Sequence, residues 1–97
     1  TGKGFGSVEP ATYSLYQNFP NPFNPTTDIS FSIAADSRVT INIYNTVGQL
    51  VRQVANADYK KGTYTINFDG SDLASGVYFY KINAGEFTDE KKMVLIK

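Results

Sequence analysis

The 97-residue sequence contains no cysteine, no histidine and no tryptophan. Without histidine and cysteine, the chain cannot form a Ser-His-Asp or Cys-His catalytic arrangement, or a zinc site of the common kinds. The absence of cysteine also excludes a disulfide framework, although it does not identify the cellular compartment. No apolar run reaches the roughly 18 residues of a transmembrane helix, and no segment resembles a signal peptide. We therefore expect a non-enzymatic domain without cofactors, taken from a longer exported precursor.

An excess of charge of one sign is also absent. Nine basic and nine acidic residues give a net charge of zero. Such a chain creates no overall field that would draw it to nucleic acid or to an anionic membrane. The adjacent basic pairs at residues 60–61 and 91–92 are too few to form a phosphate-binding stripe. We expect no nucleic-acid partner.

The residues that are abundant favour β-strands. Seven Tyr and seven Phe accompany frequent Val, Ile and Thr, which suit the pleated surface of a sheet. Alternating apolar and polar residues predict strands, with the segment 56–62 as a loop between two of them. The most regular strands are predicted at residues 28–34, 38–44, 49–54, 63–68, 77–84 and 87–97. About seven antiparallel strands with turns between them and no helical pattern predict an all-β sandwich.

A change in composition near residue 14 divides the chain. Residues 1–14 are rich in Gly, Ser and Thr and lack apolar periodicity, which predicts a linker. Residues 15–97 contain the predicted strands and form the domain. The segment 13–27, which spans the start of the domain, carries three prolines that exclude a helix and a central strand. We expect an extended segment there, anchored to the core by Phe19 and Phe23.

The segment 72–80 has the residue order of a tyrosine corner. Tyr78 stands at the start of a predicted strand, and Tyr80 occupies the core position two residues later. We expect the Tyr78 hydroxyl to bond to the backbone of the preceding loop. In the same region, Asp69 and Asp72 flank a Gly-Ser turn and offer oxygen ligands for weak Ca²⁺ binding. Because further ligands are missing, we interpret both aspartates as turn residues.

Two surface features leave alternatives open. The charged residues 89–92 form either a solvated edge that discourages aggregation or a contact patch for a receptor. The tyrosines at positions 16, 44 and 59 could stack on sugar rings, as in a carbohydrate-binding module, or could simply be half-buried. The sequence alone does not decide either question.

Four blocks of this sequence resemble one family. The segment LYQNFPNPFNPTT at residues 15–27 resembles the opening of the type IX (Por) secretion system C-terminal sorting domain, in its long PNPFNP form. NTVGQLVR at residues 45–52, LASGVYFY at 73–80 and KMVLIK at 92–97 resemble later blocks of the family in the same order. The resemblance implies an immunoglobulin-like β-sandwich. It also implies recognition residues at Pro20, Asn21, Pro22, Gly76, Tyr78, Lys92, Met93, Val94, Leu95, Ile96 and Lys97.

The resemblance also implies a role and partners. Such a domain directs an N-terminal cargo of the same precursor from the periplasm across the outer membrane, to the cell surface or the medium. Its partners would be the outer-membrane translocon and a sortase-like peptidase that removes the domain by cleavage within residues 1–14. The chain departs from the shorter Tyr-Pro-Asn-Pro opening of other sorting signals. We therefore expect export rather than any particular fate after export.

Physical arguments for recognition apply to both ends of the domain. Prolines restrict the conformations of the opening segment, so little conformational entropy of the chain would be lost when a receptor bound it. The final strand is apolar on both faces and, at a sheet edge, would offer backbone groups for strand addition or self-association. Two other functions remain: a carbohydrate-binding or adhesive module, and a passive structural spacer. In either case the opening segment and the final strand would serve only to complete the sandwich.

Overall fold

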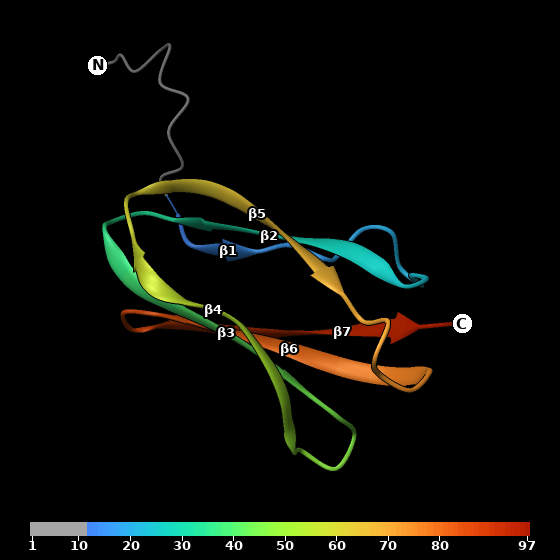
Figure 1. Ribbon diagram of the computed structural model, residues 1–97. Helices are drawn as coiled ribbons and strands as arrows, with labels where there is room; N and C mark the ends of the chain where they lie inside the picture. The colour runs from blue at the N-terminus through green and yellow to red at the C-terminus, as the bar shows by residue number, and fades with distance from the viewer. Residues whose placement is uncertain (1–11) are drawn as a thin grey trace.

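The computed structural model describes residues 12–97, which form seven β-strands and no helix, and therefore no membrane-spanning helix (Figure 1). The predicted linker lies almost wholly outside the described residues. The strands are β1 (Ser14–Leu15), β2 (Thr26–Ile33), β3 (Ser37–Tyr44), β4 (Leu50–Tyr59), β5 (Gly62–Asp69), β6 (Gly76–Ala84) and β7 (Phe87–Leu95).

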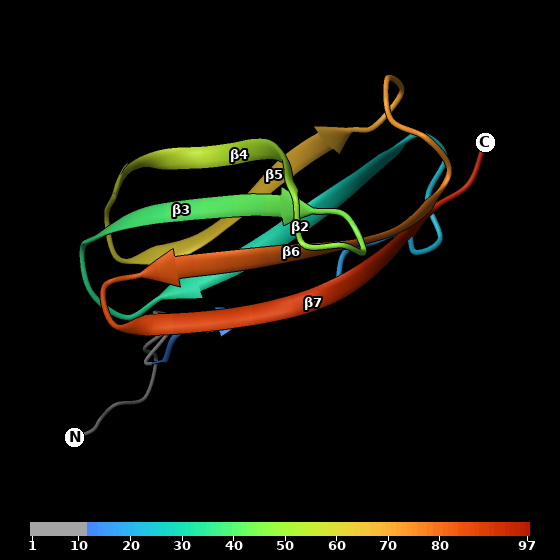
Figure 2. The ribbon, with the colours of Figure 1, turned by 90° about the horizontal axis from the view of Figure 1, so that it is seen from below.

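The strands form two facing antiparallel sheets. One sheet has the order β1-β2-β5, and the other has the order β4-β3-β6-β7 (Figure 2). The chain changes sheet between β2 and β3, between β4 and β5, and again between β5 and β6. This arrangement confirms the all-β, immunoglobulin-like sandwich that the sequence predicts.

The core lies between the two sheets because alternate residues of each strand point inward. Ile29, Phe31 and Ile33 of β2 are fully buried, as are Tyr80 and Ile82 of β6. The hydrophobic effect supplies roughly 1.5–3 kcal/mol for each large apolar side chain that is buried in this way. The period-two alternation therefore both predicts the strands and explains why they face each other.

One strand is longer than predicted. The sequence predicted a strand at residues 49–54 and a loop at 56–62, but β4 continues to Tyr59. Its second half pairs in register with β3, with Asp58 opposite Arg38 and Tyr59 opposite Ser37. Residues 56–58 of this half are exposed, whereas Ala55 is buried and the Tyr59 ring packs edge-on against Phe31. Backbone pairing, which leaves no apolar pattern in the sequence, holds it in the sheet.

The loops and turns gather at two opposite ends of the sandwich (Figure 1). The end at which residues 12–13 lead into β1 is called the proximal end; it holds the turns at residues 34–36, 60–61 and 85–86. The other end, from which the chain leaves β7, is called the distal end. It holds the turns at residues 45–49 and 70–75 and the proline-rich segment 20–25.

Candidate functional site

The proline-rich segment covers the exposed edge of β7 at the distal end. The Phe23 N–H donates to the Val94 carbonyl at 2.9 Å, and the Ile96 N–H donates to the Phe23 carbonyl at 2.9 Å. The Asn21 side chain accepts a hydrogen bond from the Val94 N–H at 3.0 Å. The Gln17 amide donates to the Lys92 carbonyl at 2.7 Å. The outward-facing Lys92 carbonyl, the Val94 N–H and carbonyl, and the Ile96 N–H are therefore bound within the chain.

This geometry corrects one expectation. The sequence predicted that the final strand would offer unpaired backbone groups for strand addition, and β7 is indeed at the edge of its sheet. Between Lys92 and Ile96, however, the segment around Phe23 takes the place that a partner strand would fill. An uncovered edge is a template for aggregation, so intramolecular covering protects the strand. A partner at this end would have to read side chains instead.

Phe23 anchors the segment in the core. Its side chain is 1% exposed, and its ring centroid lies 6.1 Å from that of Phe68 in an edge-on contact. Gly70 makes room for it, because a Cβ there would lie 3.2 Å from the Leu95 side chain and 3.4 Å from the Phe23 ring. The prediction for Phe19 is wrong: that side chain is 78% exposed, although its backbone pairs with Asp28.

A buried network of hydrogen bonds holds the proline-rich segment in place. The Tyr80 hydroxyl accepts from the Asn18 N–H at 2.7 Å and donates to the Tyr16 carbonyl at 2.7 Å. The Asn18 side-chain amide donates to the Thr27 hydroxyl, which in turn donates to the Pro20 carbonyl at 2.8 Å. Among the described residues, no buried side-chain nitrogen or oxygen lacks a partner. The network fixes the path of the chain through its prolines.

Sequence reasoning missed this network. Asn18 and Thr27 are 2% and 1% exposed, which is unusual for polar residues. They flank the prolines in the sequence, but Tyr80 lies about sixty residues away, and the hydrogen bond joining it to Asn18 spans 62 positions. No spacing rule connects such positions. The only feature of the sequence that could have indicated the network was the presence of polar residues beside a segment that must be extended.

Alkaline pH should loosen this network. Burial raises the pKa of Tyr80 to about 12, whereas a tyrosine in an unfolded chain has a pKa of about 10. The unfolded state therefore loses its proton first, and the free energy of unfolding should fall as the pH rises from about 10 to about 12. We expect Y80F to show a smaller decline over this window in urea denaturation. An equal decline in both proteins would contradict the assignment.

The tyrosine corner is confirmed. The Tyr78 hydroxyl donates to the Ala74 carbonyl at 2.7 Å, and the residue is 7% exposed. Gly76 has a φ of +152°, which is unfavourable for residues with a side chain, and it pairs with Leu95 of β7. The turn before β6 is therefore shaped by Gly76 and closed by Tyr78. Both residues lie beside the terminal strand.

The predicted recognition residues come together at the distal end, but they differ in accessibility. Met93 and Leu95 are buried in the core, and Tyr78 is nearly so, which leaves their side chains no route to a partner. Val94 is half-buried. The exposed members are Pro20, Asn21, Pro22, Lys92, Ile96 and Lys97.

All four sequence blocks meet at the distal end. The block at residues 45–52 forms the β3–β4 turn, and the block at 73–80 forms the turn into β6. The proline-rich block runs parallel to the edge of β7 at Phe23, where it pairs with Leu95 of the terminal block. Segments that are separated by up to about seventy residues thus share one end of the molecule (Figure 1).

The aspartates at the distal end act as turn and pairing residues. Asp69 accepts a hydrogen bond from the Ser71 N–H at 2.9 Å, and hydrogen bonding to Ser71 lowers the pKa of this carboxyl. Asp72 forms an ion pair with Arg52 at 2.7 Å. Within residues 12–97, no three His, Cys, Asp or Glu side chains are grouped as metal ligands.

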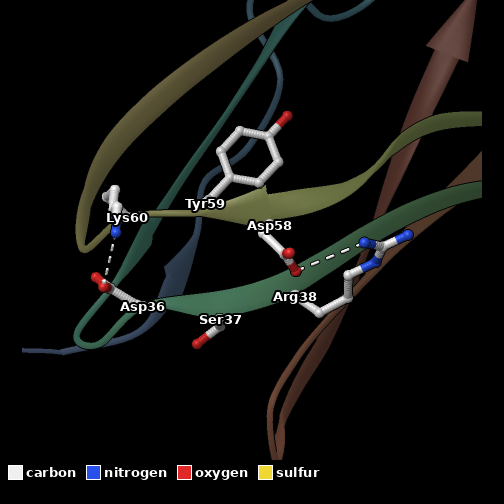
Figure 3. A pocket seen from close by; sticks show the side chains of 6 residues that line it. All are labelled: Asp36, Ser37, Arg38, Asp58, Tyr59 and Lys60. Atoms are coloured by element: carbon white, nitrogen blue, oxygen red, sulfur yellow. Dashed lines mark ion pairs between the residues drawn. The ribbon is translucent and has the colours of Figure 1, made fainter.

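A cavity of about 270 Å³ lies at the proximal end, between the start of β3 and the end of β4 (Figure 3). Arg38 pairs with Asp58 and Lys60 pairs with Asp36, each at 3.5 Å. Exposed pairs of this kind contribute only about 0–1 kcal/mol. Because each carboxylate already has a cation, the cavity offers no free charged group of either sign among these four. It is lined by Asp36, Ser37, Arg38, Asp58, Tyr59 and Lys60.

The tyrosines considered for sugar binding do not form one platform. Tyr16 bonds to Ser32 of the three-stranded sheet, whereas Tyr44 belongs to β3 of the other sheet. The Tyr59 ring packs edge-on against Tyr64, with the centroids 4.9 Å apart. A flat row of exposed aromatic rings, which sugar stacking needs, is not built from these three residues.

Comparisons with known proteins agree with the blocks. The model of the secretion system C-terminal sorting domain family matches residues 17–97. A solved structure of PorZ from Porphyromonas gingivalis, an essential bacterial surface component of the type IX secretion system, is 22% identical with a TM-score of 0.59. The match covers 87% of this chain but 12% of that chain, and it shows the fold alone. No curated protein matches.

The family match decides the role of this domain. Domains of this family are non-catalytic sorting signals of the type IX secretion system, which leads through the periplasm and the outer membrane to the cell surface or beyond. The matched region includes all the exposed distal residues described above, and all of the network beneath them except Tyr16. The chain therefore belongs to the family of secretion system C-terminal sorting domains.

Proposed function

We propose that the distal end is the face by which the export machinery recognises this domain. The observation that carries the proposal is the meeting of four separated blocks at one end of the sandwich. Two of them, the proline-rich block and the terminal block, are joined by backbone hydrogen bonds through Phe23. A partner would read them as one composite surface. Recognition of such a surface would require the folded domain and not only a short peptide.

The proposal includes the place of the cargo. The described chain enters at the proximal end, beside the β2–β3 turn, because Ser14 pairs with Ser32 of β2. A cargo domain connected through residues 1–14 would therefore sit at the end opposite to the recognition face. It would leave the distal end open to the translocon. A sortase-like peptidase would reach the linker and separate the cargo from the domain.

The whole protein's chemistry would then belong to the cargo. The domain itself contains neither His nor Cys, and its carboxylates in the distal turns are engaged by Ser71 and Arg52. Its contribution to an exported enzyme or adhesin would be delivery alone. The identity of the cargo would not alter the recognition step, because the two lie at opposite ends.

Export of a fused reporter tests this proposal. Residues 1–97 are fused to the C-terminus of a periplasmic reporter in a type IX-competent host, and the reporter is assayed outside the cell. We expect A74E, in the exposed distal turn, to reduce export roughly tenfold, because a desolvated carboxylate would oppose docking by about 1.4 kcal/mol or more. The matched variant A35E, in an exposed proximal turn, should be exported normally.

Two results would overturn the proposal. One is retention of the folded wild-type fusion in the periplasm. The other is equal export of both Ala→Glu variants, which would make the distal end irrelevant. A passive spacer predicts that deleting the domain leaves export unchanged, and a sugar-binding module predicts measurable glycan affinity for the purified domain.

A further inference from the structure

The outer face of the four-stranded sheet is apolar in its distal half. Cross-strand partners share a face, and Tyr44 stands opposite both Leu50 and Phe79, while Val77 stands opposite Val94. Their chain neighbours, such as Ile43 and Tyr80, point into the core. We call the outward set the apolar patch: Tyr44, Leu50, Val77, Phe79, Val94 and Ile96.

The proximal half of the same face is polar. Asn42 accepts a hydrogen bond from the Gln53 amide at 2.8 Å, and Lys81 stands opposite Glu90. Strand pairing therefore does not require apolar residues on this face. Within the patch, Leu50 is 56% exposed and Ile96 is 50% exposed. The apolar half coincides with the end at which the four family blocks meet.

The charges nearest the patch on this face are lysines. Lys92 stands opposite Phe79 and is exposed, and Lys81 follows Phe79 on the same face of β6 with Glu90 opposite it. The Lys97 ammonium donates to the Ser71 carbonyl at 2.6 Å. The β3–β4 turn at residues 45–49, next to Leu50, carries no charge. Electrostatic complementarity therefore favours a partner that presents apolar groups bordered by carboxylates.

Two other occupants fit less well. A second copy packed face to face would bring Lys92 of both copies to one interface, and like charges oppose such packing. A membrane surface is also disfavoured, because each lysine contributes only about 1 kcal/mol to binding of anionic lipids and polybasic sites use more of them. A protein surface remains.

We propose that the apolar patch is the docking face for an acidic-rimmed protein of the export machinery. This inference rests on the proposed function and makes it more specific: contact is made through the open face of the β4-β3-β6-β7 sheet and not through the strand edge. Leu50 and Ile96 would supply the apolar contacts, and Lys92 would meet a carboxylate of the partner.

Charge substitutions in the fused reporter test the inference. We expect L50E and I96E each to lower export tenfold or more, and K92E to lower it several-fold, without changing the melting temperature of the domain. The matched variant Q53E lies on the same face of β4 but in the polar half, and it should be exported like the wild type. Co-expression of excess free wild-type chain should compete with the reporter, whereas free L50E should not.

The outcomes distinguish failure of the docking face from failure of the sorting role. If the wild-type fusion is exported and L50E, I96E and K92E are exported equally well, the docking face is overturned and the sorting role stands. If the wild-type fusion stays in the periplasm, the sorting role fails and the docking face with it. Two further results would overturn a protein partner: a wild-type dimer that L50E dissociates in analytical ultracentrifugation, or L50E-sensitive binding to phosphatidylglycerol vesicles.

Discussion

Replacement of Phe23 by alanine should destabilise the domain by about 3–5 kcal/mol, the usual cost of removing a buried phenylalanine ring. The ring is 1% exposed and fills the space between Phe68 and Leu95 above Gly70. Folded domains are stable by only about 5–15 kcal/mol, so a loss of this size is a large share of the total. Urea denaturation of the purified 97-residue chain measures it.

The same substitution should release the edge of β7. Without its anchor, the proline-rich segment loses the hydrogen bonds that Phe23 forms with Val94 and Ile96. The uncovered strand, apolar on both faces near its end, becomes a template for another copy. We expect F23A to form dimers or larger assemblies in analytical ultracentrifugation at concentrations at which the wild type remains monomeric. Self-association through the terminal strand would thus be a property of the uncovered domain.

Phe19 provides the matched control. It carries the same side chain four positions earlier in the same segment, but it is 78% exposed. We expect F19A to change the free energy of unfolding by no more than about 0.5 kcal/mol, the usual range for exposed sites. It should also leave the oligomeric state unchanged. Equal effects of F19A and F23A would show that the segment is not anchored as described.

Replacement of Tyr80 by phenylalanine should cost about 1–3 kcal/mol, although only one oxygen atom is removed. The hydroxyl joins the Asn18 N–H to the Tyr16 carbonyl, and both groups would lose a partner at a site where Asn18 is 2% exposed. An unsatisfied buried donor retains its full desolvation cost. Urea denaturation should therefore show a lower midpoint with an unchanged slope.

A second tyrosine separates this effect from the general loss of a hydroxyl. The Tyr64 hydroxyl also donates to a backbone carbonyl, that of Lys60 at 2.7 Å, but at an exposed site where water can replace it. We expect Y64F to cost no more than about 0.5 kcal/mol. If Y80F is as mild as Y64F, the network does not hold the proline-rich segment.

The sequence predicted the strands well where one face is buried. In β2, β3 and β6 every second residue is apolar, because alternate side chains point into the core, and a pattern of period two records that fact. The second half of β4 was not predicted because its backbone pairs with β3 while residues 56–58 are exposed. A polar edge strand and a polar loop have similar composition, so only the paired backbone distinguishes them.

The candidate site was likewise predictable from the sequence only in part. The blocks that carry Pro22, Gly76 and Val94 were visible in the sequence, and the Tyr78 hydrogen bond could be predicted from local order. The covering of β7 could not, because it depends on where a segment some seventy residues earlier comes to lie. The different burial of Phe19 and Phe23 could not be predicted either, because both are phenylalanines of the same segment and only the fold places one of them in the core.

The sequence by itself determined the strands with a buried face, the absence of histidine and cysteine chemistry, and the four blocks that identify the family. These features depend only on residue type and on the order of neighbouring residues, because short-range sterics and hydrophobic periodicity act between residues that are close in the sequence. The tertiary structure alone decided that the blocks meet at one end, that the terminal edge is covered, and that an apolar face remains open beside it. Contacts between distant segments follow from the folded path of the whole chain, and no local pattern encodes them.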